Sequence, residues 1–312
     1  MSLMREASFY DKLDGKKVHC RLCRRHCRLS VGQQGVCGVR VNRHGTLCTL
    51  VYARPCSTHV DPIEKKPFFH FFPGSKTFSI ATVGCNFRCR HCQNHEISQM
   101  PTDARRIMGE RVEPAEVVDM AIQAGCKSIS YTYTEPTIFY EYAFHIARLA
   151  KEKGLFNTFV TNGYTEEEPL RAIRPYLDAA NIDLKGYDKE FYRKVCRADL
   201  SKVIKTIRLY RALGIWMELT TLIIPGYNDS EDGLRAIARF IAGDLGPDVP
   251  WHVSAFYPAY KLPGVPRTPP ETLVLARQIG IDEGLRYVYV SMWGMCPVLK
   301  GSTHAAANVK KR

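Results

Sequence analysis

From Thr77 onward, short runs rich in apolar and β-branched residues alternate with longer runs whose apolar residues recur every three or four positions. The short runs predict buried strands, and the longer runs predict amphipathic helices that cover them. This alternation is typical of repeated strand–helix units with a parallel sheet. We expect strands at 77–83, 127–133, 156–161, 179–185, 215–224, 250–257 and 286–290.

Proline and glycine mark the ends of the expected helices, as Pro114 and Gly125 do for the first of them. The helices are expected at 114–124, 137–153, 166–174, 200–213, 230–242 and 270–283. Six strand–helix units and a last strand are too few for a closed eightfold barrel. They predict an α/β fold, either a partial (β/α)6 TIM-type barrel or an open doubly wound sheet. In both, ligands gather at the carboxyl ends of the strands.

Composition and charge narrow the class of protein. The 312 residues are 45% hydrophobic and 24% charged, which excludes a disordered chain. No run approaches the roughly 18 apolar residues of a membrane span, and the charged start lacks the apolar core of a signal peptide, so we expect a cytoplasmic protein. The net charge of +13 is spread along the chain, which favours a solvated basic surface over a nucleic-acid-binding module.

Twelve cysteines are unusual for such a protein, because a reducing compartment discourages disulfides. Metal or redox chemistry explains them better. Seven lie in two tight groups, whereas we interpret the isolated Cys48, Cys56, Cys126 and Cys196 as small apolar residues.

The second group follows the first expected strand of the sheet, in the order Cys85, Cys89 and Cys92. Three thiolates leave one metal position open, either to water on zinc or to a substrate or cofactor on an iron of a [4Fe-4S] cluster. Alternatively, His91 or His95 completes an ordinary zinc site.

The first group, Cys20, Cys23, Cys27 and Cys37, is a full set of four thiols. It predicts a closed metal site. The spacing suits a zinc knuckle, and a second [4Fe-4S] cluster that relays electrons is the alternative.

Several segments together resemble a known family. They are CRLCRRHCRLSVGQQGVCGVR, DPIEKKPFFHFFPGS, ATVGCNFRCRHCQNHEIS, SISYTYTEPTIFYEYA, TNGY, NIDLKGYD and IIPGYND, in this order. They are similar to the radical S-adenosylmethionine (SAM) enzyme of the AmmeMemoRadiSam system, a relative of the pyruvate formate-lyase activating enzymes. The resemblance covers about residues 15–290 and implies a partial barrel of the radical SAM type.

The resemblance also implies an activity. A [4Fe-4S] cluster on Cys85, Cys89 and Cys92 would bind SAM through its open iron and cleave it reductively to a 5′-deoxyadenosyl radical. The radical would take hydrogen from an unknown substrate, a protein glycine by analogy with the activating enzymes. Implied partners are a flavodoxin or ferredoxin type electron donor, and Memo-like and AMMECR-like proteins. The alternative is a non-radical zinc metalloprotein or a nucleic-acid-binding module.

Polar residues at the ends of three strands resemble the SAM contacts of the same relatives. Glu135 matches the glutamate of a Gly-Gly-Glu motif that holds the SAM amino group, although Tyr133 and Thr134 replace the glycines. Asn162 and the pair of Asp183 and Lys185 resemble further strand-end motifs. From the residues alone, Asn162 is equally consistent with a plain turn, and the Asp183–Lys185 pair with a local ion pair.

The same pattern predicts the division of the chain. We expect a small Cys-rich amino-terminal module at 1–60, a connector at 61–76, the barrel at 77–290 and a tail at 291–312 that departs from the family and keeps only Cys296. The alanine- and lysine-containing end predicts little ordered structure there.

Overall fold

The expected strands are confirmed as members of one mixed sheet. The computed structural model describes residues 4–291, so most of the expected tail, including Cys296, lies outside the described residues. The sheet has eight strands in the order β14-β13-β12-β11-β10-β9-β8-β7. Their bounds are β7 Ser57–Pro62, β8 Lys76–Ala81, β9 Ser128–Tyr131, β10 Phe156–Thr161, β11 Ala179–Asp183, β12 Trp216–Ile223, β13 Trp251–Ala255 and β14 Val288–Ser291.

Strands β8 to β14 are parallel to their neighbours, so their carboxyl ends meet at one edge of the sheet. β7 is antiparallel to β8 and pairs along its whole length, from Ser57 opposite Ala81 to Pro62 opposite Lys76. The hydrophobic pattern does not predict β7. In the described part of the chain β7 and β14 form the two edges, and the sheet is therefore a partial barrel of six strand–helix units and a last strand, as expected.

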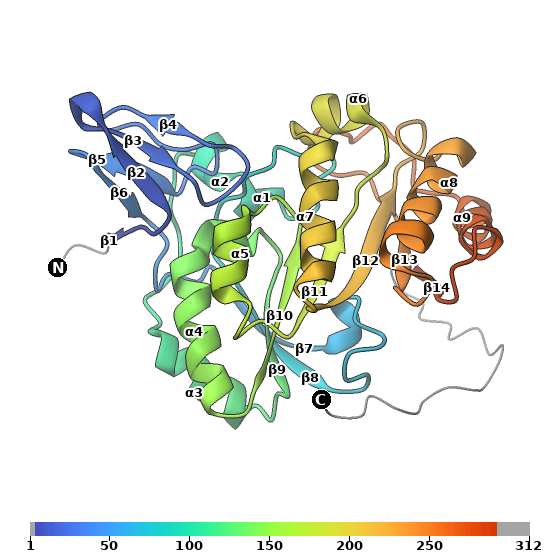
Figure 1. The fold of residues 1–312 in the computed structure, drawn as a ribbon, viewed down its shortest axis with the longest axis horizontal. Coiled ribbons are helices and arrows are strands. Elements are labelled where there is room, and N and C mark those ends of the chain that lie inside the picture. Colours follow the sequence, from blue (N-terminus) through green and yellow to red (C-terminus); the bar gives the residue numbers. More distant parts are fainter. Residues whose placement is uncertain (1–3, 292–312) are drawn as a thin grey trace.

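The longer helices lie along the outer side of the sheet, and the short α1, α2 and α6 lie in the loops that follow β8 and β11 (Figure 1). Their bounds are α1 His95–Ser98, α2 Met100–Asp103, α3 Pro114–Gln123, α4 Tyr140–Glu152, α5 Glu167–Ile173, α6 Lys189–Phe191, α7 Leu200–Ala212, α8 Glu231–Phe240 and α9 Pro270–Asp282. Local signals set their ends. The side chain of Asp199 caps α7 by accepting from Ser201 N, and Gly214 follows its carboxyl end with a φ of 66°.

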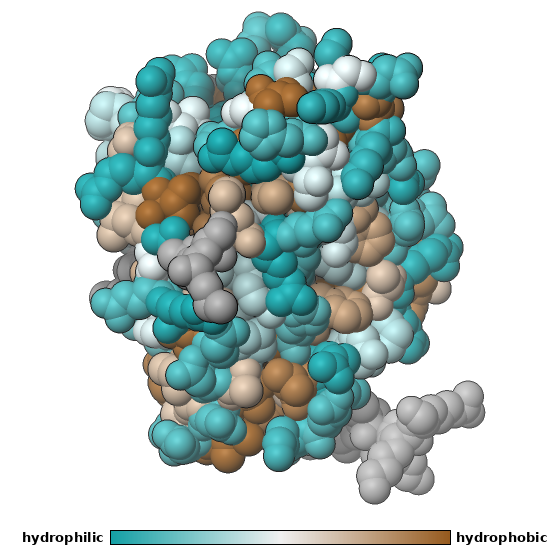
Figure 2. Space-filling model, turned by 90° about the vertical axis from the view of Figure 1, so that its left-hand side faces the viewer, coloured by the Kyte–Doolittle hydropathy of each residue, from teal (hydrophilic) through white to brown (hydrophobic). Residues whose placement is uncertain are grey.

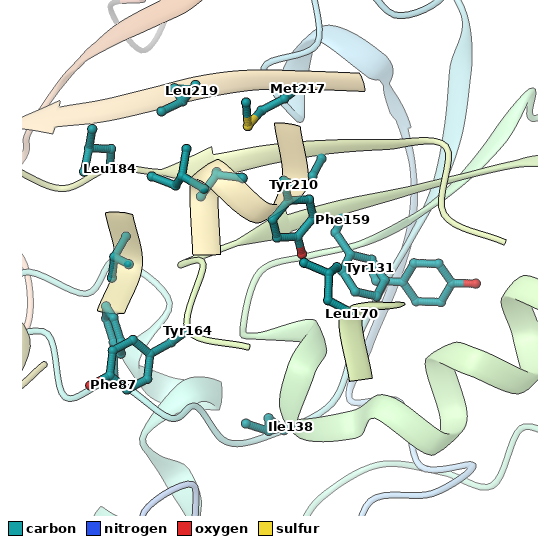
Figure 3. Close-up of a cluster of buried hydrophobic side chains, with 14 of the residues drawn as sticks. Phe87, Tyr131, Ile138, Phe159, Tyr164, Leu170, Leu184, Tyr210, Met217 and Leu219 are labelled. Carbon is teal, nitrogen blue, oxygen red and sulfur yellow. The ribbon is translucent and has the colours of Figure 1, made fainter. Parts of the chain in front are cut away.

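A buried hydrophobic cluster fills the space between the sheet and these helices (Figure 3). Tyr131 and Phe159 from neighbouring strands pack edge to face, with ring centroids 5.4 Å apart. Phe87, from the three-cysteine loop, packs against Tyr164 at 5.1 Å (Figure 3). The cysteine loop is thus anchored by an aromatic residue of its own in the core.

The segment between β7 and β8 closes the amino-terminal end of the sheet, opposite the strand ends that bear the predicted site. Its backbone N–H groups at Phe69 and His70 each donate to the buried carboxylate of Glu218, at 3.0 Å. The ring of Phe72 packs on Phe156, the first residue of β10, at 4.4 Å. Because aromatic side chains cover this end, the interior of the barrel opens toward the strand carboxyl ends.

The amino-terminal residues form two small antiparallel sheets beside the barrel (Figure 1). Their strands are β1 Arg5–Glu6, β2 Tyr10–Leu13, β3 Lys17–Cys20, β4 Arg28–Leu29, β5 Arg40–Arg43 and β6 Thr46–Thr49. The cysteine-bearing turn between β3 and β4 meets the barrel directly, through a β-bridge between Cys23 and Thr165 and a bond from Arg24 N to Tyr164 O of 3.0 Å. The division into a module, a connector and a barrel remains a prediction.

Hydrophilic side chains cover much of the face shown in Figure 2, and hydrophobic residues form separate patches between them. Among residues 4–291, no helix combines the length and the hydrophobicity needed to cross a membrane.

Candidate functional site

Three thiols gather in the loop that follows β8. Cys85, Cys89 and Cys92 all line one cavity of about 230 Å³, at the edge where the parallel strands end. Cys89 is buried, and the other two are half-buried. The residues that the sequence predicts for cofactor binding line the same cavity, namely Glu135, Asn162, Asp183 and Lys185. The fold therefore brings together side chains that are about a hundred residues apart in the chain.

Close packing fixes the path of this loop. Gly84 has a φ of 103°, in the region that favours glycine, and a Cβ atom there would lie 2.7 Å from Val39 Cγ1 and 2.9 Å from Cys37 O. The guanidinium of Arg88 donates to Cys85 O at 3.4 Å and also to the backbone oxygen of Val36. The three-cysteine loop is thus packed against the loop that carries the last cysteine of the amino-terminal set.

Glu135 is fully buried at the end of β9 and accepts four hydrogen bonds. Its Oε1 accepts from Thr137 N at 3.1 Å, Thr137 Oγ1 at 2.6 Å and Thr161 Oγ1 at 2.8 Å, and its Oε2 accepts from Asn162 N at 2.9 Å. Burial raises the pKa of Glu135, although these bonds act in the opposite direction. Oε1 accepts three of these bonds and Oε2 only one, so Oε2 is the oxygen with room for an ammonium group.

Tyr133 holds an unusual backbone conformation beside this glutamate. Its φ is 61°, in the left-handed region, at a position where the related motif has glycine. Asn94 Nδ2 donates to Tyr133 O at 2.8 Å, and Thr134 Oγ1 donates to Thr82 O at 2.8 Å. These two hydrogen bonds hold the turn at Tyr133 although the residue is not glycine.

Asn162 connects the acidic and the thiol parts of the site. Its Nδ2 donates to Asn86 Oδ1 at 2.8 Å and approaches Cys85 Sγ at 3.8 Å. Its Oδ1 accepts from Tyr164 N at 3.1 Å, which is the local turn expected from the sequence. Asn162 thus makes the turn and also lines the cavity.

Asp183 and Lys185 form an ion pair of 2.9 Å at the end of β11, on the wall of the cavity. Burial opposes the charge on Lys185, but the neighbouring carboxylate of Asp183 holds the pKa of Lys185 well above its usual range. Asp183 and Lys185 thus form the local ion pair that the sequence suggests, and they also line the cavity.

The surroundings of the thiols favour their neutral form unless a cation is bound. Burial, and next Glu135, raise the pKa of Cys85 well above its usual range, and burial also raises that of Cys92. A protonated thiol does not bind metal, so only a bound positive charge makes the thiolate form favourable here. Phe87 N donates to Cys85 Sγ at 3.3 Å, and hydrogen bonds of this kind adjust the potential of an iron-sulfur centre. The donor set fits the [4Fe-4S] cluster that the sequence predicts.

A larger cavity of about 800 Å³ adjoins the first, and Asn94, Tyr133, Thr134 and Asp183 line both. Lys66 lies on its wall with 2% of its surface exposed. Its ammonium is 2.8 Å from Asp61 and 4.0 Å from the centre of the Tyr133 ring. Burial lowers the pKa of Lys66 to about 8 despite this partner. The cavity offers room for a substrate next to the predicted SAM site.

The four amino-terminal cysteines also come together. Cys20, Cys23, Cys27 and Cys37 line an enclosed cavity of about 20 Å³. A Cβ atom on Gly35 would lie 3.7 Å from the sulfurs of both Cys27 and Cys37. Burial raises the pKa of Cys37 to about 11 and that of Cys23 still further.

One further residue next to the three-cysteine loop cannot be identified from the sequence. Cys196, which the pattern interprets as a small apolar residue, lies beside Cys89, and its thiol raises the pKa of Cys89 well above its usual range. No spacing rule joins two cysteines more than a hundred residues apart, so only the folded chain reveals this contact.

Comparisons with known proteins agree with this geometry. A family model described as the radical SAM superfamily matches residues 79–240, which include the three-cysteine loop and the ends of β8 to β12. An uncharacterized protein of Methanocaldococcus jannaschii is 50% identical over 287 residues, covering 92% of this chain and 85% of that protein.

Two further relatives are more distant. A second Methanocaldococcus jannaschii protein, whose name proposes a glycyl-radical enzyme activating enzyme, is 30% identical over 178 residues, covering 54% of this chain and 70% of that protein. The crystal structure of a radical SAM methyltransferase from Sphaerobacter thermophilus matches with a TM-score of 0.55 and 18% identity, covering 71% of this chain and 67% of that chain. This second likeness concerns the fold alone.

Proposed function

The chain belongs to the radical SAM superfamily and is related to the glycyl-radical enzyme activating enzymes; from this premise we propose that Cys85, Cys89 and Cys92 hold its [4Fe-4S] cluster. The cluster and SAM of this family supply one chemistry, the reductive cleavage of SAM to a 5′-deoxyadenosyl radical that takes hydrogen from a substrate. Membership in this enzyme superfamily replaces the alternative of a non-radical zinc or nucleic-acid-binding protein.

One observation carries the proposal. The three thiols share a single cavity with Glu135, Asn162, Asp183 and Lys185, and all reach it from the carboxyl ends of the parallel strands.

The polar residues of the cavity have separate tasks in this proposal. The buried carboxylate of Glu135 accepts the SAM ammonium, and the ammonium of Lys185 pairs with the SAM carboxylate. Asn162 holds Glu135 and the Cys85 loop in register through its bonds to both. These side chains are positioned by strand ends and by one another, so little ordering remains to be done when SAM binds.

The experiment is SAM cleavage under anaerobic conditions. Protein reconstituted with iron and sulfide, reduced with dithionite and given SAM should release 5′-deoxyadenosine. Cys89→Ala should release none, while Cys126→Ala, which changes a buried cysteine outside the cavity, should match the unchanged protein. Absence of 5′-deoxyadenosine from the unchanged protein, or its persistence in Cys89→Ala, would contradict the proposal.

We further propose a protein substrate whose glycine loses hydrogen, within the AmmeMemoRadiSam system, with Memo-like and AMMECR-like proteins as partners. The relative named as a glycyl-radical enzyme activating enzyme supports the reaction class. The adjoining cavity of about 800 Å³ supports entry of a peptide segment beside the cluster. A low-potential donor of the flavodoxin or ferredoxin type would supply the electron.

The substrate proposal has its own test. We would mix the reconstituted enzyme anaerobically with dithionite, SAM and one candidate partner at a time. Each mixture is then frozen for electron paramagnetic resonance. A glycyl radical on one partner, whose doublet collapses when its glycines carry deuterium, is the expected result. Release of 5′-deoxyadenosine that no partner candidate stimulates would exclude these partners without affecting SAM cleavage.

We also propose that residues 1–60 form a module around a metal centre on Cys20, Cys23, Cys27 and Cys37. The enclosed cavity of about 20 Å³ supports a single zinc ion. The full set of four thiols is equally suited to a second [4Fe-4S] cluster. Metal analysis decides: about four iron atoms and one zinc per chain indicate zinc, and about eight iron atoms without zinc indicate a second cluster.

A further inference from the structure

A buried turn brings a thiol of distant sequence to the cysteine loop. The π-helical turn Tyr192–Cys196 ends at Arg197, which has a φ of 56°. Two backbone bonds join this turn to the loop, from Arg88 N to Cys196 O at 3.1 Å and from Arg90 N to Val195 O at 2.9 Å. Because these bonds fix the backbone on both sides, the position of the Cys196 side chain next to Cys89 is set by the fold.

Three donor atoms converge at this point. One ring nitrogen of His91 and the sulfurs of Cys89 and Cys196 all lie within 4.8 Å of one another, and all three residues are buried. Ligands of a single zinc ion at Zn–S of about 2.3 Å and Zn–N of about 2.0 Å stand about 3.5 to 3.8 Å apart. A contraction of at most about 1.0 to 1.3 Å would bring the three atoms to that spacing.

His91 supplies an independent sign of a ligand. Its side chain is 3% exposed and stacks on the ring of Phe191, yet its Nδ1 is buried without a hydrogen-bond partner in the described structure. A buried polar atom left unpaired costs about 1 to 3 kcal/mol. A metal ion bound through Nδ1 would give this nitrogen the partner that the protein does not supply.

Two thiolates and an imidazole select a thiophilic divalent cation. Such a set suits Zn²⁺, Co²⁺ or Fe²⁺, and excludes the oxygen-seeking Mg²⁺ and Ca²⁺. The two thiols would release their protons on binding, so that the charges of two thiolates and the ion cancel. Water can complete a tetrahedral set from the cavity of about 230 Å³, which His91 and Cys89 also line.

We propose that Cys89, His91 and Cys196 form a second, mononuclear site for a thiophilic divalent cation, occupied when the iron-sulfur cluster is not assembled. Cys89 belongs to both ligand sets, so the single ion and the cluster exclude each other. The exclusion, though not the ion site itself, rests on the proposed function. A cation bound at this site therefore blocks cluster assembly until it is removed.

The test is a Co²⁺ titration of the full chain, freed of cluster by a chelator and kept anaerobic and reduced. The unchanged protein should bind one equivalent more than Cys196→Ser, and the difference spectrum should contain thiolate-to-cobalt charge transfer. Cys126→Ser, which changes another buried cysteine, should bind as the unchanged protein does. The amino-terminal cysteines take up the same amount in all three proteins.

His91→Gln is the second variant, and it keeps both thiols. Its cobalt affinity at this site should fall at least tenfold, with a shift in the ligand-field bands. Circular dichroism establishes that each variant is folded. Equal stoichiometry and identical spectra for the unchanged protein and a folded Cys196→Ser would overturn the site.

Exclusion has a separate readout. Zn²⁺ added at the extra equivalent before reconstitution should slow iron uptake by the unchanged protein but not by Cys196→Ser. Equal slowing in both proteins would overturn the exclusion. If the protein failed to cleave SAM, the cobalt stoichiometry would be unaffected, so failure of the proposed function is distinguishable from failure of this inference.

Discussion

At the scale of single residues, the site depends on polar groups that the fold has removed from water. Glu135 shows the balance best, because it is completely buried and accepts four hydrogen bonds. Such bonds compensate for the loss of hydration, and they also aim the carboxylate. In the proposed function the same residue both stabilises the fold and binds SAM.

Glu135→Gln separates these two roles. The amide replaces one acceptor oxygen with a donor, so at least one of the four partners loses its bond and the free energy of unfolding should fall by about 1 to 3 kcal/mol. SAM affinity should fall tenfold or more because the negative charge is gone. Thr137→Val removes one bond from Oε1 but keeps the charge, and it should reduce stability while SAM affinity stays near its original value. Urea unfolding and equilibrium dialysis measure both; unchanged SAM affinity in Glu135→Gln would rule out its proposed role.

Lys66 makes the stability of the protein depend on alkaline pH. Burial lowers the pKa of Lys66 to about 8, against 10.5 in the unfolded chain. Between these two values the unfolded chain binds a proton that the folded protein has released, so raising the pH favours the folded form. Once Lys66 is deprotonated in both states, the free energy of unfolding has risen by on the order of 3 kcal/mol.

Comparison with Lys66→Met isolates the contribution of Lys66 to the pH dependence of stability, because the two proteins share all other titrating groups. The free energy of unfolding of the unchanged protein should rise relative to that of the variant as the pH goes from 7.5 to 10. Urea denaturation at several pH values gives the difference. A difference that stays constant over this range would mean that Lys66 has an ordinary pKa.

At the scale of elements, the cysteine loop is a strand-to-helix connection held between the barrel and the amino-terminal sheets. Arg25 illustrates this arrangement, because its Nε donates to Asn86 O at 2.7 Å and another of its nitrogens donates to the backbone oxygen of Arg197. One side chain thus joins the amino-terminal cysteines, the three-cysteine loop and the turn that bears Cys196. The elements around the site are interdependent.

Gly84→Ala tests how tightly these elements pack. The substitution forces a side chain into the left-handed region and against Val39 and Cys37 O, so it should cost about 1 kcal/mol in backbone conformation and about 1 to 3 kcal/mol more in overlap. Gly125→Ala is the matched control, since Gly125 has a φ of 67° with nothing within 4 Å of its Cβ position. Urea unfolding should show the larger loss for Gly84→Ala, accompanied by reduced iron retention. Equal losses in both variants would show that the loop has room to move.

At the scale of the whole molecule, the sequence predicts the parallel strands and the helices of the barrel. It does not predict the antiparallel edge strand β7. The seven expected strands and six expected helical segments are confirmed because each has a strong hydrophobic period and clear proline or glycine ends. β7 was not predicted, because the polar residues of STHVDP lack that period and its pairing with β8 depends on the edge position.

The candidate site divides in the same way. The gathering of Cys85, Cys89 and Cys92 at one strand end could be predicted because they are close in sequence and follow a buried strand. The contact of Cys89 with Cys196, and the position of Lys66 beside Asp61 and Tyr133, could not be predicted, because each depends on where distant elements meet. Sequence spacing shows local ligand sets, and only the fold shows what surrounds them.

The central claim is that three thiolates of the β8 loop hold a cubane cluster whose remaining iron is open to SAM. Electron paramagnetic resonance of the dithionite-reduced, reconstituted protein tests it most directly, with Cys20→Ser, Cys23→Ser, Cys27→Ser and Cys37→Ser combined so that a second cluster cannot contribute. We expect the signal of a reduced [4Fe-4S] cluster that changes its g values when SAM is added. A cluster signal that SAM leaves unchanged, or no cluster signal from a protein shown by circular dichroism to be folded, would contradict the account.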